Sequence, residues 1–179
     1  MSVTELEKII PVPKPRNGEE LSSIIDNVEK WLGCVLPEDY KELTFEYGSG
    51  EFCDGFLLFV CPDNFDRYVE FVTYHQNLFW RSVDSGSRKP DSQTLGNPVR
   101  LLPWGSDENG HHFHFLMNGP PECWSILLES HEGEFEKADF SISEFLVKSF
   151  RNQFRPKHIW YQLFSESELN LKRLGKNIQ

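Results

Sequence analysis

Three short segments of turn-forming residues between positions 99 and 138 constrain the fold more than any other feature of the chain. These segments, at 105–110, 118–121 and 130–133, are rich in Gly, Asn, Asp, Ser and Pro, which favour tight turns. They separate four short apolar segments: 99–104, 111–117, 123–129 and 134–138. Short apolar segments joined by tight turns pair as antiparallel neighbours. The sequence therefore predicts an antiparallel meander over this region.

Helices are predicted before the meander. Over residues 21–32 the apolar side chains recur at the spacing of one helix face, and Gly33 suits the position after the last turn. A second helix is predicted to begin at Pro37, and a third to cover residues 65–80. Residues 51–60, rich in Phe, Leu and Val, predict one buried strand between these two helices.

The helix after the meander has two start signals at once. Ser141 and Glu144 have the spacing of a capping box, in which side chains satisfy the free N–H groups of the first turn. Phe140 and Phe145 occupy the two positions of a hydrophobic staple. A helix is therefore predicted to begin immediately after Ser141.

The pattern as a whole predicts one α+β domain. Its sheet should be single, antiparallel or mixed, with about five to six strands and with the helices packed mainly on one face. We expect residues 1–19 to be an extended leader, residues 20–155 to form the domain, and residues 156–179 to be a C-terminal extension with room for one more helix. Residues 82–98 are the longest polar stretch and are predicted to be a mobile loop.

The negative charge is concentrated in the first four fifths of the chain. The formal net charge is −10, with 26 acidic and 11 basic residues before Lys148, and 2 acidic and 7 basic residues from there to the end. A body with a net charge of −15 repels a phosphate backbone, so we expect no binding to nucleic acid. It attracts a basic protein, and that association should be faster at low salt. Acidity that serves solubility alone is the alternative.

The sequence favours a cytoplasmic protein without membrane contact. The first ten residues lack the apolar core and the cleavage site of a signal peptide. No apolar run reaches the roughly 20 residues that cross a bilayer. The cysteines form no CxxC pair, and we expect them to be reduced, buried thiols: Cys34, Cys53, Cys61 and Cys123.

Three motifs, in one order along the chain, resemble those of the SUKH superfamily, also called the Smi/Knr family. They are Leu36-Pro37-Glu38-Asp39-Tyr40 leading to Tyr47-Gly48-Ser49-Gly50, then Leu102-Pro103-Trp104-Gly105-Ser106-Asp107-Glu108-Asn109-Gly110, and finally Phe140-Ser141-Ile142-Ser143-Glu144-Phe145-Leu146. Within them we expect structural roles for six residues: Pro37, Tyr40, Trp104, Gly105, Asp107 and Gly110.

The resemblance implies a binding role and supplies no catalytic residue and no cofactor. Bacterial members resemble immunity proteins that bind and block toxins, often nucleases, by stoichiometric occlusion. We therefore expect an immunity protein of this branch, whose partner is a basic toxin domain. The alternative is a regulatory or scaffolding module related to the eukaryotic regulators of cell-wall glucan synthesis.

Acidic residues near two turns are the candidate partner-binding site: Asp107, Glu108, Glu132, Glu134 and Glu136. Glu129 and Asp139 extend this run. A basic partner could dock on these carboxylates. The competing interpretations are that Asp107 caps its turn and that the other carboxylates form a solvated edge, which keeps sheets from pairing.

A metal-dependent enzyme is a third, less favoured interpretation, and we expect neither a metal nor a catalytic site. His112 and His114 share one strand face, with His111 opposite, and His131 or Cys123 from a neighbouring strand could complete a zinc site. Cys123 paired with a histidine would be a nucleophile, but no motif activates it.

Overall fold

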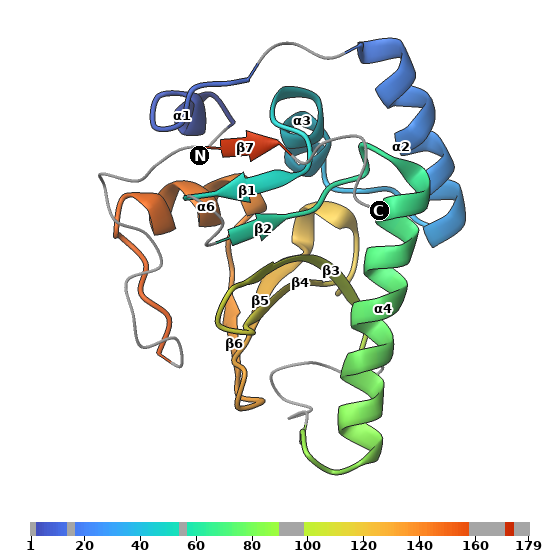
Figure 1. Ribbon diagram of the computed structural model, residues 1–179, viewed down its shortest axis with the longest axis vertical. Helices are drawn as coiled ribbons and strands as arrows, with labels where there is room; N and C mark the ends of the chain where they lie inside the picture. Colours follow the sequence, from blue (N-terminus) through green and yellow to red (C-terminus); the bar gives the residue numbers. More distant parts are fainter. Residues whose placement is uncertain (1–2, 14–16, 54–56, 90–98, 158–170, 174–179) are drawn as a thin grey trace.

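The computed structural model describes residues 3–13, 17–53, 57–89, 99–157 and 171–173 of the 179-residue chain. Its helices are α1 (Val3–Glu7), α2 (Gly18–Leu32), α3 (Glu38–Glu46), α4 (Phe65–Asp84) and α6 (Ile142–Phe150), with a short 3₁₀ helix η1 (Pro121–Cys123). Its strands are β1 (Gly50–Phe52), β2 (Leu57–Phe59), β3 (Leu101–Asp107), β4 (His112–Leu116), β5 (Ser125–Glu129), β6 (Phe135–Ala138) and β7 (Leu171–Arg173). Figure 1 shows their arrangement.

All strands belong to one antiparallel sheet with the order β6-β5-β4-β3-β2-β1-β7. The α+β class and the single antiparallel sheet are therefore confirmed, and β3 to β6 form the predicted meander. Strand β7 comes from the C-terminal extension and pairs with β1, which adds a strand beyond β1 to β6. Residues 158–170 and 174–179, where another helix was predicted, lie outside the described residues.

Three local predictions differ from the structure. The strand predicted over 51–60 is two strands, β1 and β2, and Cys53 has a left-handed φ of 56° where β1 ends. Helix α4 continues to Asp84, so the first residues of the predicted loop are helical. The leader is not extended throughout, because Val3 and Leu6 bury one side of the short helix α1 against the core.

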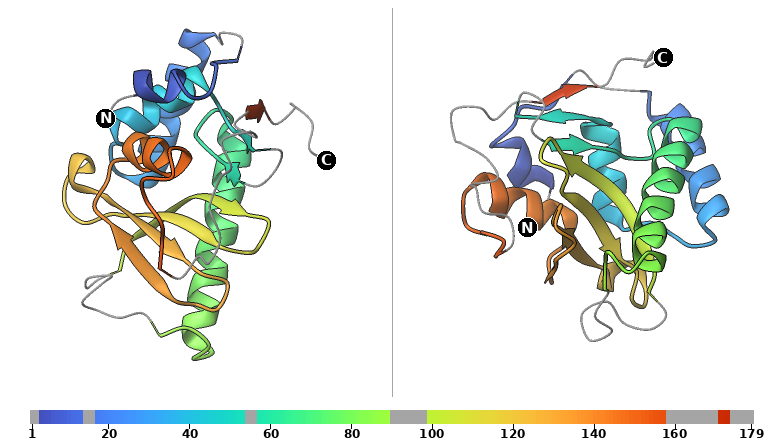
Figure 2. Two further views of the ribbon diagram at one scale, coloured as in Figure 1. Left: turned by 90° about the vertical axis from the view of Figure 1, so that its left-hand side faces the viewer. Right: turned by 60° about the horizontal axis from the view of Figure 1, so that its bottom comes forward.

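The two faces of the sheet pack against different helices (Figures 1 and 2). On one face, Phe113 and Phe115 of β4 join the main apolar cluster with Tyr40 of α3 and Phe145 of α6. On the other face, Leu116 packs with Phe79 from the second half of α4. Helices α3 and α6 thus share one face, while α4 covers the opposite one, so the helices are less confined to one face than the sequence predicted.

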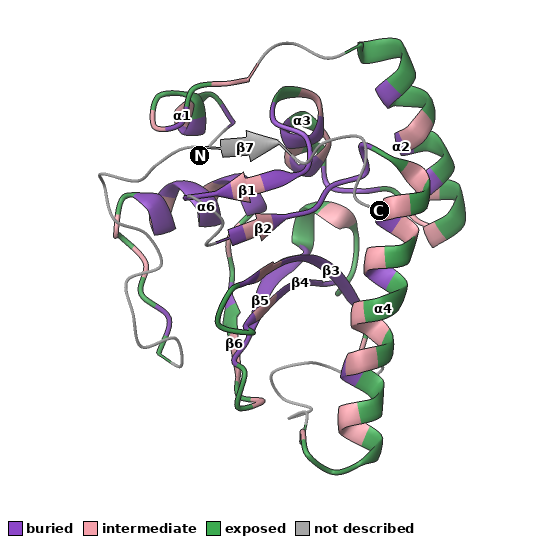
Figure 3. Ribbon diagram, viewed as in Figure 1, coloured by how far each residue is buried: buried purple, intermediate pink, exposed green. Residues whose placement is uncertain are grey.

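The predicted start of α6 is confirmed. The Ser141 side chain accepts a hydrogen bond from the Glu144 backbone N–H. The rings of Phe140 and Phe145 both pack on Phe154, at 5.3 Å and 5.8 Å between centroids. This cap and the apolar cluster fix α6 against the sheet, and Figure 3 shows α6 buried along most of its length.

Candidate functional site

The β3–β4 turn and the β5–β6 turn lie at the same end of the sheet. Strands β4 and β5 pair with His112 opposite Glu129, so the first residue of β4 faces the last residue of β5. The rings of His111 and His131, one from each turn, are 5.5 Å apart. Two turns about twenty residues apart in the sequence are therefore neighbours in space.

Three of the predicted partner-binding residues meet at this end: Glu108, Glu132 and Glu134, and all three are exposed. We call these three residues the acidic end of the sheet. Ser130 orders one of its turns, because its hydroxyl accepts a hydrogen bond from the Glu134 backbone N–H at 3.0 Å. The carboxylates are thus carried on turns held by the sheet and not on a long loop.

The other predicted acidic contacts lie elsewhere. Glu136 is half-buried on β6 and accepts a hydrogen bond from the Lys157 backbone N–H. Asp139 follows β6 and pairs with Lys137 at 2.7 Å. Glu136 is thus two positions after Glu134 but is held against Lys157, and Asp139 lies beyond the far end of β6.

Asp107 holds the β3–β4 turn from inside. Its carboxylate accepts hydrogen bonds from the backbone N–H groups of Asn109 and His111, at 2.9 Å and 3.0 Å, and lies 2.8 Å from His111 Nδ1. The Asp107 side chain is fully buried. Gly110 has a φ of +80°. This left-handed backbone conformation is energetically unfavourable for any residue that carries a side chain. These observations support the turn-capping interpretation of Asp107 and a structural role for Gly110.

Trp104 and Gly105 are also structural. Trp104 is fully buried and stacks on Phe113 with 5.3 Å between ring centroids. A Cβ atom at Gly105 would lie 2.8 Å from the Leu58 carbonyl oxygen on the neighbouring strand β2. Glycine is therefore needed at position 105 for β2 and β3 to pair at their observed spacing.

Glu129 does not lie on a solvated edge, so that interpretation is wrong for this residue. Its side chain is 1% exposed and binds His114 Nε2 at 2.8 Å and Arg88 Nη1 at 2.6 Å. Burial raises the pKa of Glu129, but the hydrogen bond from His114 and the charges of His114 and Arg88 outweigh it and lower the pKa below its usual value. The carboxylate is a buried anchor between β5 and the segment after α4.

The five histidines that the structure describes divide into two groups. His112 and His114 face α4, where His75 lies 4.9 Å from His112 between ring centroids. Burial lowers the pKa of His75 to about 4 and that of His112 below its usual value, and nearby histidines add to both effects. His131 instead contacts His111 beside the two turns.

Cys123 does not join either histidine group. It is exposed in η1, before β5 begins, whereas the histidine turns follow the other end of that strand. Within the residues that the structure describes, no group of three or more His, Cys, Asp or Glu side chains could hold a metal ion. The set proposed for zinc is thus not brought together. The expectation of buried thiols holds for Cys53 and Cys61 but fails for the exposed Cys123, and Cys34 is only half-buried.

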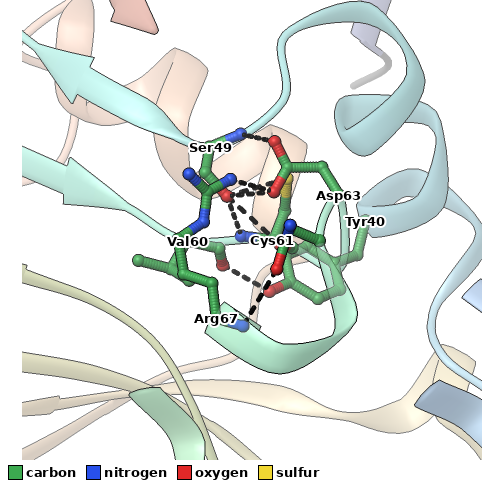
Figure 4. Close-up of polar contacts among 7 residues, drawn as sticks. Tyr40, Ser49, Val60, Cys61, Asp63 and Arg67 are labelled. Carbon is green, nitrogen blue, oxygen red and sulfur yellow. Dashed lines mark hydrogen bonds and ion pairs between the residues drawn. The ribbon is translucent and has the colours of Figure 1, made fainter. Parts of the chain in front are cut away.

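A second polar cluster, which sequence reasoning missed, joins the end of α3 to β2 and α4 (Figure 4). Asp63 accepts hydrogen bonds from the Ser49 backbone N–H and hydroxyl, at 2.9 Å and 2.8 Å, and from Arg67 at 2.6 Å. Beside it, the Tyr40 hydroxyl donates to the Val60 carbonyl. The cluster is buried and fixes three chain segments, so its role is structural.

Comparison with known families agrees with this arrangement. The sequence model of the SUKH family described as SMI1-KNR4 cell-wall matches residues 22–146. No curated protein and no solved structure matches the chain significantly. Among the described residues, no helix is long and apolar enough to cross a membrane. Because the family match covers more than half of the 179 residues, the chain belongs to the SUKH family.

Proposed function

We propose that the chain is an immunity protein of the SUKH family, which binds a basic toxin domain and blocks it by stoichiometric occlusion, without catalysis. The family supports a protein that acts through protein interaction. The toxin proposed here is a nuclease, because a nuclease surrounds its active site with basic residues to hold a phosphate backbone. The cytoplasm of the cell that needs protection is the proposed place of action.

The observation that carries this proposal is the acidic end of the sheet. Glu108, Glu132 and Glu134 are exposed on two neighbouring turns. The backbone of one turn is held by Asp107 and that of the other by Ser130. Carboxylates on an ordered backbone lose little conformational freedom when they meet a basic surface. They would occupy the place that phosphates take on a nuclease.

The charge of the whole chain supports the same partner. The net charge of −10 attracts a basic domain from a distance, and this attraction raises the association rate at low ionic strength. Arg88 does not oppose this attraction, because the buried carboxylate of Glu129 neutralises its charge. The net charge would thus speed the approach of the same basic partner that the acidic end then contacts.

The second candidate function is a regulatory or scaffolding module. The family description, which refers to the cell wall, favours it. In this case the acidic end would bind a basic region of a host protein, with no toxin involved. The two functions therefore share a surface but differ in the partner.

A pull-down tests the proposal and separates the two functions. The probe is the toxin domain of a secreted toxin found by inspection of the neighbouring genes, made in an inactive form and immobilised. We expect the full chain to bind it in a one-to-one complex that weakens as salt rises. Absence of binding at low salt would contradict the immunity function.

Two triple variants refine this test. The acidic-end variant combines Glu108→Lys, Glu132→Lys and Glu134→Lys. The control variant makes the same charge change at three exposed residues on α3 and α4: Glu42→Lys, Glu70→Lys and Asp84→Lys. We expect only the acidic-end variant to lose binding beyond the loss that the net charge explains.

A further inference from the structure

A groove opens at the other end of the meander. It has a volume of about 360 Å³ and lies between the segment before α3, η1 and the start of α6. The apolar side chains that line it include Val35, Pro37, Phe115, Pro121, Trp124 and Ile142. Val35 is 52% exposed, so the groove presents an accessible aliphatic side chain at its edge.

The groove and the acidic end are at opposite ends of β4 and β5. Phe115 lies near the last residue of β4, and Trp124 lies immediately before β5. The acidic end lies at the opposite ends of the same two strands. A partner bound in the groove would therefore not need the carboxylates of the acidic end.

Only acidic residues supply charge to the groove. Glu38 and Glu122 line it and are exposed, and none of the lining residues is basic. Lys41 neutralises part of this charge, because it lies 2.6 Å from Glu38 and 3.6 Å from Glu29. A third lining carboxylate, Asp39, already accepts two hydrogen bonds from Ser143. Glu122, together with the Glu38 oxygen that does not contact Lys41, can thus meet an incoming charge.

We propose that this groove is a second docking site, which takes a segment of a partner protein with an apolar side chain flanked by Lys or Arg. The apolar side chain packs among Val35, Phe115 and Trp124, where burial of apolar area drives binding. The flanking cations lie at the rim beside Glu38 and Glu122. The volume is at the low end of the roughly 300–1,000 Å³ of typical ligand pockets, so it suits one or two side chains and not a large cofactor.

Synthetic peptides test this site with NMR chemical-shift mapping on the full ¹⁵N-labelled chain. The first peptide has Leu-Phe flanked on each side by two lysines. The second replaces the lysines with glutamates, and the third replaces Leu-Phe with Gly-Gly. We expect the first peptide to shift the signals of Val35, Leu36 and the Trp124 indole, and the other two to bind at least about tenfold more weakly.

Charge and shape variants locate the binding. Glu38→Lys with Glu122→Lys, and separately Val35→Glu, should each weaken the first peptide by about tenfold or more. The matched control, Glu70→Lys with Asp84→Lys, changes the charge equally on α4 and should bind the first peptide like the unaltered chain. Val35 is half exposed, so its substitution tests the groove without emptying the core.

The proposal is overturned if the lysine and glutamate peptides bind alike, or if the shifts lie outside the groove. It is also overturned if the control variant loses as much affinity as the groove variants. The acidic-end variant should bind the first peptide as the unaltered chain does. The groove can therefore be confirmed even where the toxin does not bind, and the two proposals fail independently.

Discussion

The carboxylate of Asp39 on α3 accepts two hydrogen bonds from Ser143 on α6, although 104 residues separate them. The Ser143 backbone N–H donates at 3.0 Å and its hydroxyl at 2.9 Å. Ser143 is fully buried in the first turn of α6, where backbone N–H groups lack partners within the helix. Asp39 thus acts as a cap on a helix to which it does not belong, and it joins two of the motifs that resemble the family.

Asp39→Ala should lower the free energy of unfolding by about 1–3 kcal/mol, because buried donors of Ser143 lose an acceptor. Asp39→Asn keeps an oxygen acceptor and should cost less. Urea unfolding followed by circular dichroism measures both. Equal stability of the alanine variant and the unaltered chain would show that this contact does not hold α3 to α6.

Gly105→Ala should destabilise the sheet by about 1–3 kcal/mol, because its Cβ would lie 2.8 Å from the Leu58 carbonyl oxygen. Gly18→Ala is the matched control. Nothing lies within 4 Å of a Cβ at position 18, in the first turn of α2, so this change should be neutral or slightly stabilising. Thermal unfolding of the two variants compares them. A Gly105→Ala variant as stable as the control would contradict the close approach of β2 and β3.

Glu129→Gln should destabilise the fold by about 3 kcal/mol, because it leaves the buried side of Arg88 without a counter-charge. Glu132→Gln is the control. Glu132 is exposed in the turn that follows β5, so this change should alter stability little. Urea unfolding at pH 7 measures both. Similar small effects of the two substitutions would contradict the buried role of Glu129.

Stability should fall as the pH decreases from 6.5 towards 4. The pKa of His75 is about 4 in the folded chain, below its ordinary 6.5, so the unfolded chain binds more protons in this window. Burial lowers the pKa of His112 as well, and it adds to the same slope. The lowered pKa of Glu129 adds a loss of stability at the acidic end of this window and below it, because its stabilisation starts to be lost at about the ordinary pKa of 4.5.

His75→Gln isolates the contribution of one histidine. It removes the group with the pKa of about 4, so the loss of stability between pH 6.5 and 4 should become smaller. Urea unfolding at several pH values in this window measures the slope. An unchanged slope would show that His75 does not remain neutral between α4 and the sheet.

Local signals in the sequence predicted local structure. Ser141 and Glu144 are three residues apart, and their cap depends only on the first turn of α6. Asp107 and Gly110 form one turn, so the turn-capping interpretation needed no distant residue. The same holds for the meander, whose strands are sequence neighbours joined by short turns.

Contacts between distant segments could not be predicted in this way. The burial of Glu129 depends on Arg88, which follows α4 in the sequence, and on His114 from the paired strand β4. The acidic end depends on the register of β4 against β5, which places two turns side by side. The break between β1 and β2 is different, because the Asp-Gly pair at positions 54–55 is a turn signal that the single-strand prediction passed over.

Growth rescue is the most direct test of the proposed function. Cells that express the active form of the toxin domain used in the pull-down are grown with the unaltered chain, with the acidic-end variant or with the control variant. We expect the unaltered chain and the control variant to restore growth, and the acidic-end variant to fail although it is folded and equally abundant. Equal killing by the toxin with and without the unaltered chain would contradict the account.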